Sequence, residues 1–551
     1  MTPTPRHARP PSPRVVWLWL CLLALGPADT ALAAGIDARI AAELADARPG
    51  AVELAGERVQ MLDALRLFYE ARDHAPVWVS ERGYTRAGLN VLKALAAADS
   101  DGLQPRDYHL EALEALGAQG SPDPATVELL LTDGYFLYAR HLTEGKVDPA
   151  SLAAAWQPQR RYVDVVGLLE RAIEADSIVE SLLAQRPPHA AYEALRRALA
   201  EARQAPQREA GPPIPSGPTL RPGAVDPRLP RIRERVAHLQ HEAPPVAAES
   251  TRYDPALAAS IEALQSANGL TADGIIGPRT LAVLNAAPAD RIAALRANLE
   301  RWRWLPPSLG DHYIQVNIAA GSLQVVRGGE LIMQQAVVVG AEENQTPAFS
   351  RSMGYLVVNP YWNVPASIAR NEILPALKRD PGYAARNRYE ILSGWGENAR
   401  VIDPYSVNWR AIAPGSFPYR VRQRPGGNNA LGELKFMFPN PYSIYLHDTP
   451  AKQLFARGQR TFSHGCIRVE DPKGLALHLL DNQAGWDQPR LQRAIDSDRT
   501  QSIKVTQPVA VHVQYWTAGL DAEGALRWWP DVYGRDAPLV RALDGPVRLP
   551  G

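Results

Sequence analysis

The spacing of apolar residues changes along the chain, from a helical period in the first part to an alternating one in the second. Residues 34–206 are rich in Ala and Leu, and apolar positions recur about three residues apart, as at Val59, Leu62 and Leu65. From about His312, apolar residues alternate with polar ones, which is typical of half-buried strands. Such strands are predicted over residues 313–318, 323–326, 336–339 and 354–359. The pattern therefore predicts a multidomain α+β chain, helical at its N-terminal side and mostly β at its C-terminal side.

Two helical signals lie between these regions, after a proline-rich stretch. The run Gly211-Pro-Pro-Ile-Pro-Ser-Gly-Pro218 cannot form a helix or a central strand, which predicts a linker over residues 207–228. Beyond it, Asp254 and Pro255 are typical of a helix N-terminus, Gly269 ends that helix, and Pro278 begins another. The sequence therefore predicts a small helical hairpin, followed by a connecting helix over residues 291–304.

An aromatic insertion interrupts the predicted strands between residues 361 and 429. Most loops are only about 4–6 residues long, and this segment is too aromatic for a solvated linker, so we expect it to pack on something. Ser367 is predicted to cap a helix within it. Its aromatic surface comes from Trp362, Tyr383, Tyr389, Trp395 and Trp409. Strands are predicted again over residues 434–438, 442–446, 509–516 and 526–532.

The N-terminal residues 1–33 have the pattern of a secretory signal. Arg6, Arg9 and Arg14 precede an apolar core over residues 15–25, and Ala31-Leu32-Ala33 matches a small-x-small cleavage site. The core is shorter than the about 20 apolar residues that a membrane span needs. We therefore predict export with cleavage, and an uncleaved inner-membrane anchor is the alternative.

Charge and cysteine content indicate which partners are excluded and which residue is a candidate for chemistry. The chain has 59 basic and 59 acidic residues and no basic run, which argues against nucleic acid or an anionic membrane surface as a partner. Of its two cysteines, Cys21 lies in the predicted signal, so the exported protein would carry a single thiol, Cys466. A lone thiol outside the cytosol calls for a functional explanation.

The surroundings of Cys466 predict a nucleophile with a base. The predicted strand over residues 442–446 leads to His447, and Ser463-His464-Gly465-Cys466 is predicted to be a tight turn in which Gly465 adopts angles that a β-carbon would forbid. A thiol needs a nearby base or positive charge to become a thiolate at neutral pH. Two alternatives are a buried structural cysteine and a metal site made of His447, His464 and Cys466. We predict neither a metal nor another cofactor.

At these residues the chain resembles a known family. His447 and Ser463-His-Gly-Cys-Ile-Arg-Val469 are similar to the signature of the L,D-transpeptidases, the YkuD-type cysteine enzymes of bacterial cell walls. The segment Asn440-Pro-Tyr-Ser-Ile-Tyr-Leu-His-Asp-Thr-Pro450 resembles the large, multidomain Gram-negative branch. Residues 68–78 resemble the helical scaffold of that branch, and residues 264–281 resemble a peptidoglycan-binding domain. The resemblance implies a mostly β catalytic domain, a capping role for residues 361–429, and acylation by carbapenems.

The pattern and the resemblance together predict a sequence of domains. They are a signal (1–33), a helical scaffold (34–206), a linker (207–228), a peptidoglycan-binding-like domain (229–290), a connecting helix (291–311), a catalytic domain (312–506) with its insertion (361–429), and a C-terminal β extension (507–551).

The resemblance implies acyl transfer on peptidoglycan in the periplasm. Cys466 would attack a stem peptide between its third and fourth residues, and His447 would act as base and then acid, oriented by a carbonyl near Asp448. Backbone N–H groups of Gly465 and Cys466 are expected to stabilise the oxyanion.

The remaining residues of the motif have supporting roles. Ser463 belongs to the turn, and His464 is a rival base that ranks below His447. Arg468 is expected either to bind a substrate carboxylate or to form a structural ion pair. The partners implied are donor and acceptor stem peptides and other cell-wall synthesis proteins. An L,D-carboxypeptidase, an enzyme that attaches protein to the wall, and a non-catalytic wall-binding protein are the alternatives.

Overall fold

The computed structural model describes residues 35–45, 52–118, 120, 122–152, 156–157, 161–204, 211–239, 249–394, 398–413, 415–521 and 523–548. The predicted signal, Cys21 and Trp395 lie outside these residues. No helix within the described ranges is long and apolar enough to cross a membrane. The chain forms two compact units, Met1–Leu95 with Tyr108–Phe136, and Ala96–Asp107 with Leu137–Gly551. The predicted domain boundaries divide the chain differently and stay predictions.

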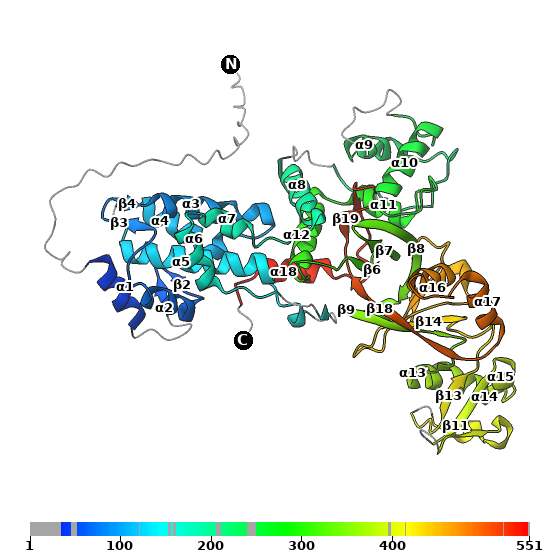
Figure 1. Ribbon diagram of the computed structural model, residues 1–551. Coiled ribbons are helices and arrows are strands. Elements are labelled where there is room, and N and C mark those ends of the chain that lie inside the picture. The colour runs from blue at the N-terminus through cyan, green and yellow to red at the C-terminus, as the bar shows by residue number, and fades with distance from the viewer. Residues whose placement is uncertain are drawn as a thin grey trace. The chain divides into compact units, whose positions relative to one another are not determined.

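The first unit is helical, as the apolar period predicts, with two short hairpins (Figure 1). Its elements are α1 (Ile36–Ala45), β1 (Glu53–Leu54), β2 (Glu57–Arg58), α2 (Leu62–Glu70), β3 (Val79–Ser80), β4 (Gly83–Tyr84), α3 (Arg86–Ala96), α4 (Leu110–Ala118) and the start of α5 (Pro124–Glu144). Glu128 on α5 is fully buried and accepts hydrogen bonds from the backbone N–H groups of Val77, Trp78 and Val79. This carboxylate satisfies backbone donors that burial would otherwise leave unpaired.

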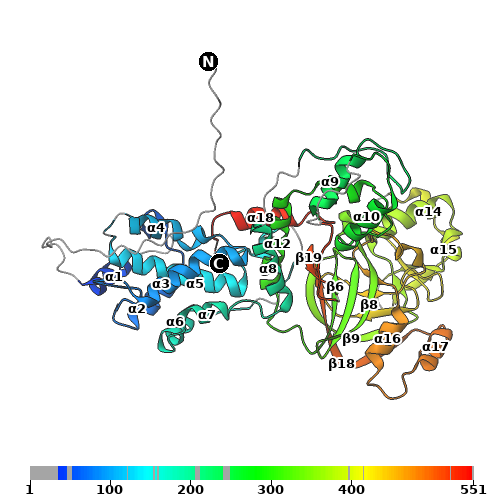
Figure 2. The same ribbon diagram turned by 90° about the horizontal axis from the view of Figure 1, so that it is seen from above.

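The second unit has several helices outside the helical hairpin and the insertion. They are η1 (Ala97–Asp101), η2 (Pro105–Tyr108), η3 (Pro149–Ser151), α6 (Val165–Glu174), α7 (Ile178–Leu183), α8 (Ala190–Gln204), α12 (Pro288–Arg303), α16 (Pro472–Leu480), α17 (Gln488–Asp496) and α18 (Asp536–Asp544). Helices α8 and α12 pack against each other and against β19 (Figure 2). The connecting helix predicted over residues 291–304 corresponds to α12.

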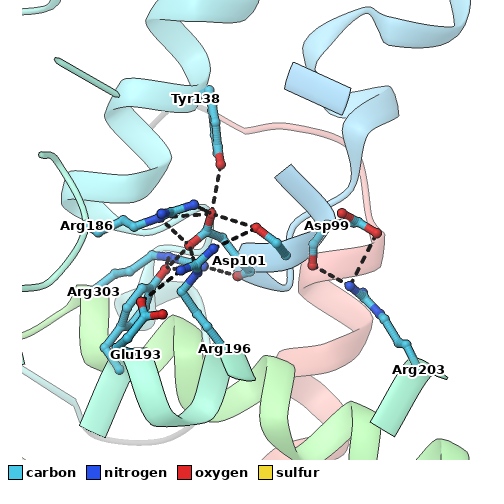
Figure 3. A network of polar contacts seen from close by, with 10 residues as sticks. Asp99, Asp101, Tyr138, Arg186, Glu193, Arg196, Arg203 and Arg303 are labelled. Carbon is cyan, nitrogen blue, oxygen red and sulfur yellow. Dashed lines mark hydrogen bonds and ion pairs between the residues drawn. The ribbon is translucent and has the colours of Figure 1, made fainter. Parts of the chain in front are cut away.

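A buried carboxylate holds η1 to these helices (Figure 3). Asp101 is fully buried, and it accepts hydrogen bonds from Arg186 and from the hydroxyls of Tyr138 and Tyr192. Arg196 lies 2.8 Å from the same carboxylate. Burial alone would raise the pKa of Asp101, but the Arg186 hydrogen bond and the surrounding guanidinium groups hold it below its usual value. Asp101 therefore stays ionised and cancels charge that would be costly to bury alone.

The helical hairpin has the termini that its residue types predict. Asp254 accepts a hydrogen bond from the Leu257 N–H at the start of α10 (Pro255–Ala267), and Gly269 follows the end of that helix with φ +59°. The other helices of this region are α9 (Leu229–Leu239) and α11 (Pro278–Asn285). The described part of the predicted linker, residues 211–228, contains no helix or strand. It is nevertheless packed, because Ile214 and Leu220 are buried in the core of the hairpin.

The predicted catalytic domain contains a closed sheet. Strands follow one another in the order β14-β15-β17-β8-β7-β6-β18-β9, and β14 also pairs with β9, so the ring closes. The strands are β6 (His312–Asn317), β7 (Ser322–Arg327), β8 (Glu330–Gly340), β9 (Ala348–Val358), β14 (Leu434–Met437), β15 (Leu446–His447), β17 (Ile467–Val469) and β18 (Gln501–Gln514). Two more strands, β5 (Trp156–Gln157) and β16 (Thr461–Ser463), pair with β9 and β8. Alternating residues such as Val316, Leu356 and Val511 are fully buried, which confirms the period-two pattern.

The insertion folds as a small subdomain with its own core. Its sheet runs β10 (Trp362–Asn363), β13 (Arg420–Gln423), β11 (Tyr389–Ser393) and β12 (Arg400–Ile402), and its helices are α13 (Ala366–Ile368), η5 (Ala369–Ile373), α14 (Leu374–Arg379) and α15 (Tyr383–Arg386). The Ser367 cap is wrong, because Pro365 occupies the cap position and Ser367 lies inside α13. The π-helical turn η5 ends at Ile373, and Pro375 lies in the first turn of α14, where its missing N–H is tolerated.

The C-terminal extension is β only in part. Strands β19 (Ala518–Leu520) and β20 (Leu526–Trp528) form a hairpin, of which only β20 lies in a predicted strand (526–532), and α18 then follows. The strand predicted over residues 509–516 is the second half of β18, which begins at Gln501. The helix was missed because its run is short and preceded by Pro530 and Gly534, which are typical of loops.

Candidate active site

Strand pairing brings the two halves of the motif together. Strands β15 and β17 are parallel, with Leu446 opposite Ile467 and His447 opposite Arg468. The Ile467 N–H donates to the Tyr445 carbonyl over 3.1 Å. His447 therefore lies on the strand next to the one that begins just after Cys466, and Tyr445 directly precedes it.

The predicted strand over residues 442–446 is wrong except at its last residue. The Asn440 side chain folds the segment, because its oxygen accepts from the N–H groups of Tyr442 and Ile444, each over 3.1 Å. Ser443 has φ +58°, and the strand contains only Leu446 and His447. This turn brings the Ser443 carbonyl to 3.8 Å from the Cys466 Sγ.

The turn of Cys466 is built as predicted, between β16 and β17. Gly465 has φ +108°, a conformation that favours glycine. The Ser463 hydroxyl is buried, donates to the Cys466 carbonyl over 2.5 Å and accepts from the Gly465 N–H over 3.1 Å. Thr346 donates to the Gly465 carbonyl over 2.7 Å. Ser463 and Thr346 therefore hold the turn rigid from both sides.

The Gly465 N–H is consequently not available for an oxyanion, which corrects the prediction at that residue. It already donates to the Ser463 hydroxyl. The Cys466 N–H has no hydrogen-bond acceptor among the residues that the structure describes. Of the two backbone donors predicted from the sequence, Cys466 is the one that remains open to a ligand.

The Cys466 thiol lies in a largely apolar but positively biased environment. Burial raises the pKa of Cys466, while a hydrogen bond from the Tyr445 hydroxyl and the charges of Lys435 and Arg468 oppose that rise. The Lys435 ammonium lies 3.9 Å from the centre of the Tyr445 ring. The resting thiol is therefore protonated near neutral pH, and the groups around it favour the thiolate when it forms.

His447 is held as a neutral base. Its side chain is buried, and its Nδ1 lies 2.5 Å from the Asp448 carbonyl oxygen. A carbonyl only accepts, so Nδ1 carries the proton and Nε2 keeps its lone pair. Burial, together with the charge of Arg468, lowers the pKa of His447 to about 3. The orienting carbonyl expected from the sequence is the one at Asp448.

The Asp448 carboxylate does not orient His447 but binds neighbouring loop residues. It accepts from the Thr449 N–H over 2.7 Å and the Glu433 N–H over 2.9 Å, and it pairs with Lys452 at 2.8 Å. Asp448 thus anchors the loops beside His447 with its side chain and orients the imidazole with its backbone.

The two histidines of the motif have different surroundings, since His447 is buried and His464 contacts the insertion. The His464 Nε2 lies 3.0 Å from a Glu372 carboxylate oxygen, and the His464 side chain is 48% exposed. Glu372 belongs to η5 of the insertion. Among the described residues, no group of three His, Cys, Asp or Glu side chains is placed to hold a metal ion.

Arg468 forms no ion pair with another residue in the described part of the chain, which contradicts the expected structural ion pair. Its buried Nε has no hydrogen-bond acceptor, and the ion pairs of this region do not include it. Burial lowers the pKa of Arg468, and the nearby Cys466 opposes this. A half-buried guanidinium beside a thiol is suited to a negatively charged or developing oxyanion ligand.

Sequence reasoning missed two residues of this site. Tyr445 lies two positions before His447, and side chains two apart share a face of an extended chain, so the signal was present. Lys435 lies opposite His447 across β14 and β15, and no local pattern indicates that pairing.

Comparison with known proteins identifies three segments of the chain. Residues 311–490 match the "L,D-transpeptidase catalytic domain" (YkuD), residues 230–284 match the "Putative peptidoglycan binding domain", and residues 63–199 match the "Scaffold domain". A Haemophilus influenzae protein named "Putative L,D-transpeptidase" is 39% identical over 245 residues. That match covers 44% of this chain and 48% of the relative, so the chain matches about half of the relative's length.

Solved structures give a weaker likeness. An L,D-transpeptidase from Mycobacterium smegmatis is 12% identical, with 37% of this chain and 58% of that chain covered and a TM-score of 0.17. One from Stackebrandtia nassauensis is 12% identical, with 55% and 96% covered and a TM-score of 0.20. TM-scores this low establish no shared arrangement of the whole chain. The segment matches identify the protein as one that carries a YkuD-type L,D-transpeptidase catalytic domain together with a peptidoglycan-binding domain and a helical scaffold.

Proposed function

We propose that this protein is a peptidoglycan L,D-transpeptidase that cross-links stem peptides through an acyl-enzyme on Cys466. The observation that carries the proposal is the neutral, buried His447, held by the Asp448 carbonyl in the tautomer whose Nε2 accepts a proton. This base lies on the strand paired with the one that follows Cys466. A base with a fixed tautomer next to a nucleophile is the arrangement that acyl transfer requires.

The first half-reaction forms a thioester. The Cys466 proton moves to the His447 Nε2 as Sγ attacks the carbonyl between the third and fourth residues of a donor stem. The peptide C–N bond then breaks, and His447 returns the proton to the amine of the departing D-amino acid. In the second half-reaction an acceptor amine attacks the thioester, its proton passes to His447, and the thiol is restored. Attack by water instead would give a trimmed stem.

The charges around the thiol support this order of events. Burial keeps the resting Cys466 and His447 uncharged, so no ion pair has to be held in a site with little water. Lys435 and Arg468 then favour the thiolate and the oxyanion as negative charge develops. The Cys466 N–H supplies one donor to the oxyanion, and Arg468 is the second group that we assign to it.

The location and partners follow from the domains present. A peptidoglycan-binding domain and a catalytic domain for peptidoglycan fit a cell-wall-associated protein. We propose that it acts in the periplasm after export by the signal over residues 1–33, with donor and acceptor stem peptides as substrates and with other cell-wall synthesis proteins as further partners.

Defined muropeptides test the proposal. Purified protein incubated with a tetrapeptide donor and an acceptor should produce cross-linked dimers by mass, and Cys466→Ala should produce none while keeping its thermal unfolding temperature. Incubation with a carbapenem should add one covalent adduct, and peptide mapping should place it on Cys466. Wild-type product from Cys466→Ala would contradict the assignment. Trimmed tripeptide without dimer would instead indicate a carboxypeptidase.

A further inference from the structure

A groove that contains neither Cys466 nor His447 lies in the same compact unit as the candidate active site. Its volume is about 610 Å³, within the range of about 300–1,000 Å³ that small-ligand sites occupy. Its walls come from β6, β7 and β8, from the C-terminal extension, and from Gly269 and Thr271 of the helical hairpin. The reaction proposed above does not use these residues.

A row of amides forms the floor of this groove. Gln315, Gln324 and Gln334 lie directly opposite one another on three adjacent strands, so their side chains share one face of the sheet. The Gln324 amide N–H donates to the Gln334 carbonyl over 3.0 Å. An amide group has two N–H donors and a carbonyl acceptor, so this single bond leaves further donors and acceptors in the row for a ligand.

An aromatic wall stands beside the amide row. Trp529 is half-buried, and its indole is enclosed by two glycines that also line the groove. A β-carbon at Gly269 would lie 2.5 Å from one edge of the indole, and a β-carbon at Gly519 would lie 3.2 Å from the other. The absence of side chains at both positions lets the backbone pack closely against both edges of the indole, so the ring is enclosed before any ligand arrives, which lowers the entropic cost of binding.

Most charged groups of the groove are already paired, and among the described residues the exposed Glu523 is the exception. Asp521 and Arg527 pair with each other at 2.5 Å. Arg460 donates to the backbone carbonyls of Ala320, Gly321 and Arg457. A groove that combines amides, a packed indole and one uncompensated carboxylate, that of Glu523, suits a ligand that carries no negative charge, is rich in hydroxyl and amide groups, and is apolar on one face.

We propose that this groove binds the glycan strand of peptidoglycan, through its N-acetylated amino sugars. The amide row would pair with hydroxyl and acetamido groups, and the Trp529 ring would pack on the C–H face of a pyranose. Gly458 and Arg460 line the groove and directly precede β16, which leads into the Cys466 turn. A glycan held here would keep stem peptides near that turn. The proposal rests on the proposed function only for the identity of the polymer.

Calorimetric titration with chitotetraose, a β-1,4-linked N-acetylglucosamine tetramer without peptide, tests the groove. The titration uses full-length protein carrying Cys466→Ala, so the result does not depend on turnover. We expect saturable binding, weakened roughly three- to tenfold by Gln315→Ala and by Gln334→Ala, as the loss of a neutral hydrogen bond predicts. Gln492→Ala, an exposed glutamine on α17, is the matched control and should bind like the parent.

Three results would overturn the inference: no saturable binding of chitotetraose, equal affinity in the groove variants and the control, or displacement of the saccharide by a free stem tetrapeptide. None of these bears on whether Cys466 forms an acyl-enzyme. Conversely, an inactive enzyme that binds chitotetraose through this groove would refute the proposed function and leave the glycan site intact.

Discussion

The His464 imidazole lies 3.0 Å from the Glu372 carboxylate, and this contact joins the turn of Cys466 to the insertion. The insertion has its own buried core around residues such as Ile373, Ile391 and Trp409, so it is a folded body rather than a loop. Both partners of the pair are about half exposed, and such pairs contribute only about 0–1 kcal/mol. We infer a cover over the reactive turn that opens at little cost.

Glu372→Gln should loosen this cover. We expect more trimmed tripeptide relative to cross-linked dimer, because water reaches the thioester more often while acylation continues. The product ratio from a defined muropeptide mixture measures this, with Asp380→Asn as the control, since Asp380 pairs with Arg386 inside the insertion. An unchanged ratio in Glu372→Gln would mean that the contact does not gate water.

The two histidines should differ sharply. His447→Gln removes the proton acceptor and should lower acylation by roughly 10²–10⁴-fold, the usual contribution of a general base. His464→Gln should retain most of its acylation rate, because its imidazole contacts Glu372. Carbapenem adduct formation followed by intact mass measures both. The roles would have to be exchanged if His464→Gln were inactive and His447→Gln active.

The raised pKa of Cys466 predicts slow alkylation at neutral pH. Only the thiolate reacts, so the rate with iodoacetamide should rise about tenfold per pH unit until pH passes the thiol pKa. Lys435→Met removes a charge that lowers this pKa, so its curve should shift to higher pH and its rate at pH 7 should fall.

Lys473→Met is the matched control for that measurement, because Lys473 pairs with Glu433 on the surface. Its alkylation curve should coincide with that of the wild type. Coincident curves for Lys435→Met and the wild type would show that Lys435 does not act on the thiol.

Asp101→Asn should destabilise the second unit (Figure 3). It leaves the partly buried Arg186 and Arg196 without their shared carboxylate, a loss that typically costs about 3–5 kcal/mol. Asp99→Asn is the control, since the 53% exposed Asp99 lies 3.5 Å from Arg203 and should matter by no more than about 0.5 kcal/mol. Denaturant unfolding compares the two, and equal midpoints would refute the network's importance.

Much of the local structure could be predicted because neighbouring residues determine it. Asp254 caps α10, Gly269 ends it, and Gly465 allows the turn of Cys466, each through preferences of a few adjacent residues. The local predictions failed where a side chain overrode backbone propensity. Asn440 folded a predicted strand into a turn, and Pro365 occupies the cap position of α13 in place of the predicted Ser367.

By itself, the sequence determined the reactive elements: a single thiol outside the predicted signal, a histidine on the preceding strand, and a glycine turn that presents the thiol. Only the tertiary structure decided which groups surround that thiol. Lys435 reaches it through the pairing of β14 with β15, and Glu372 reaches His464 from the insertion. Such contacts between distant segments depend on the register of the paired strands. Burial of the whole core selects that register, so no local sequence pattern encodes it.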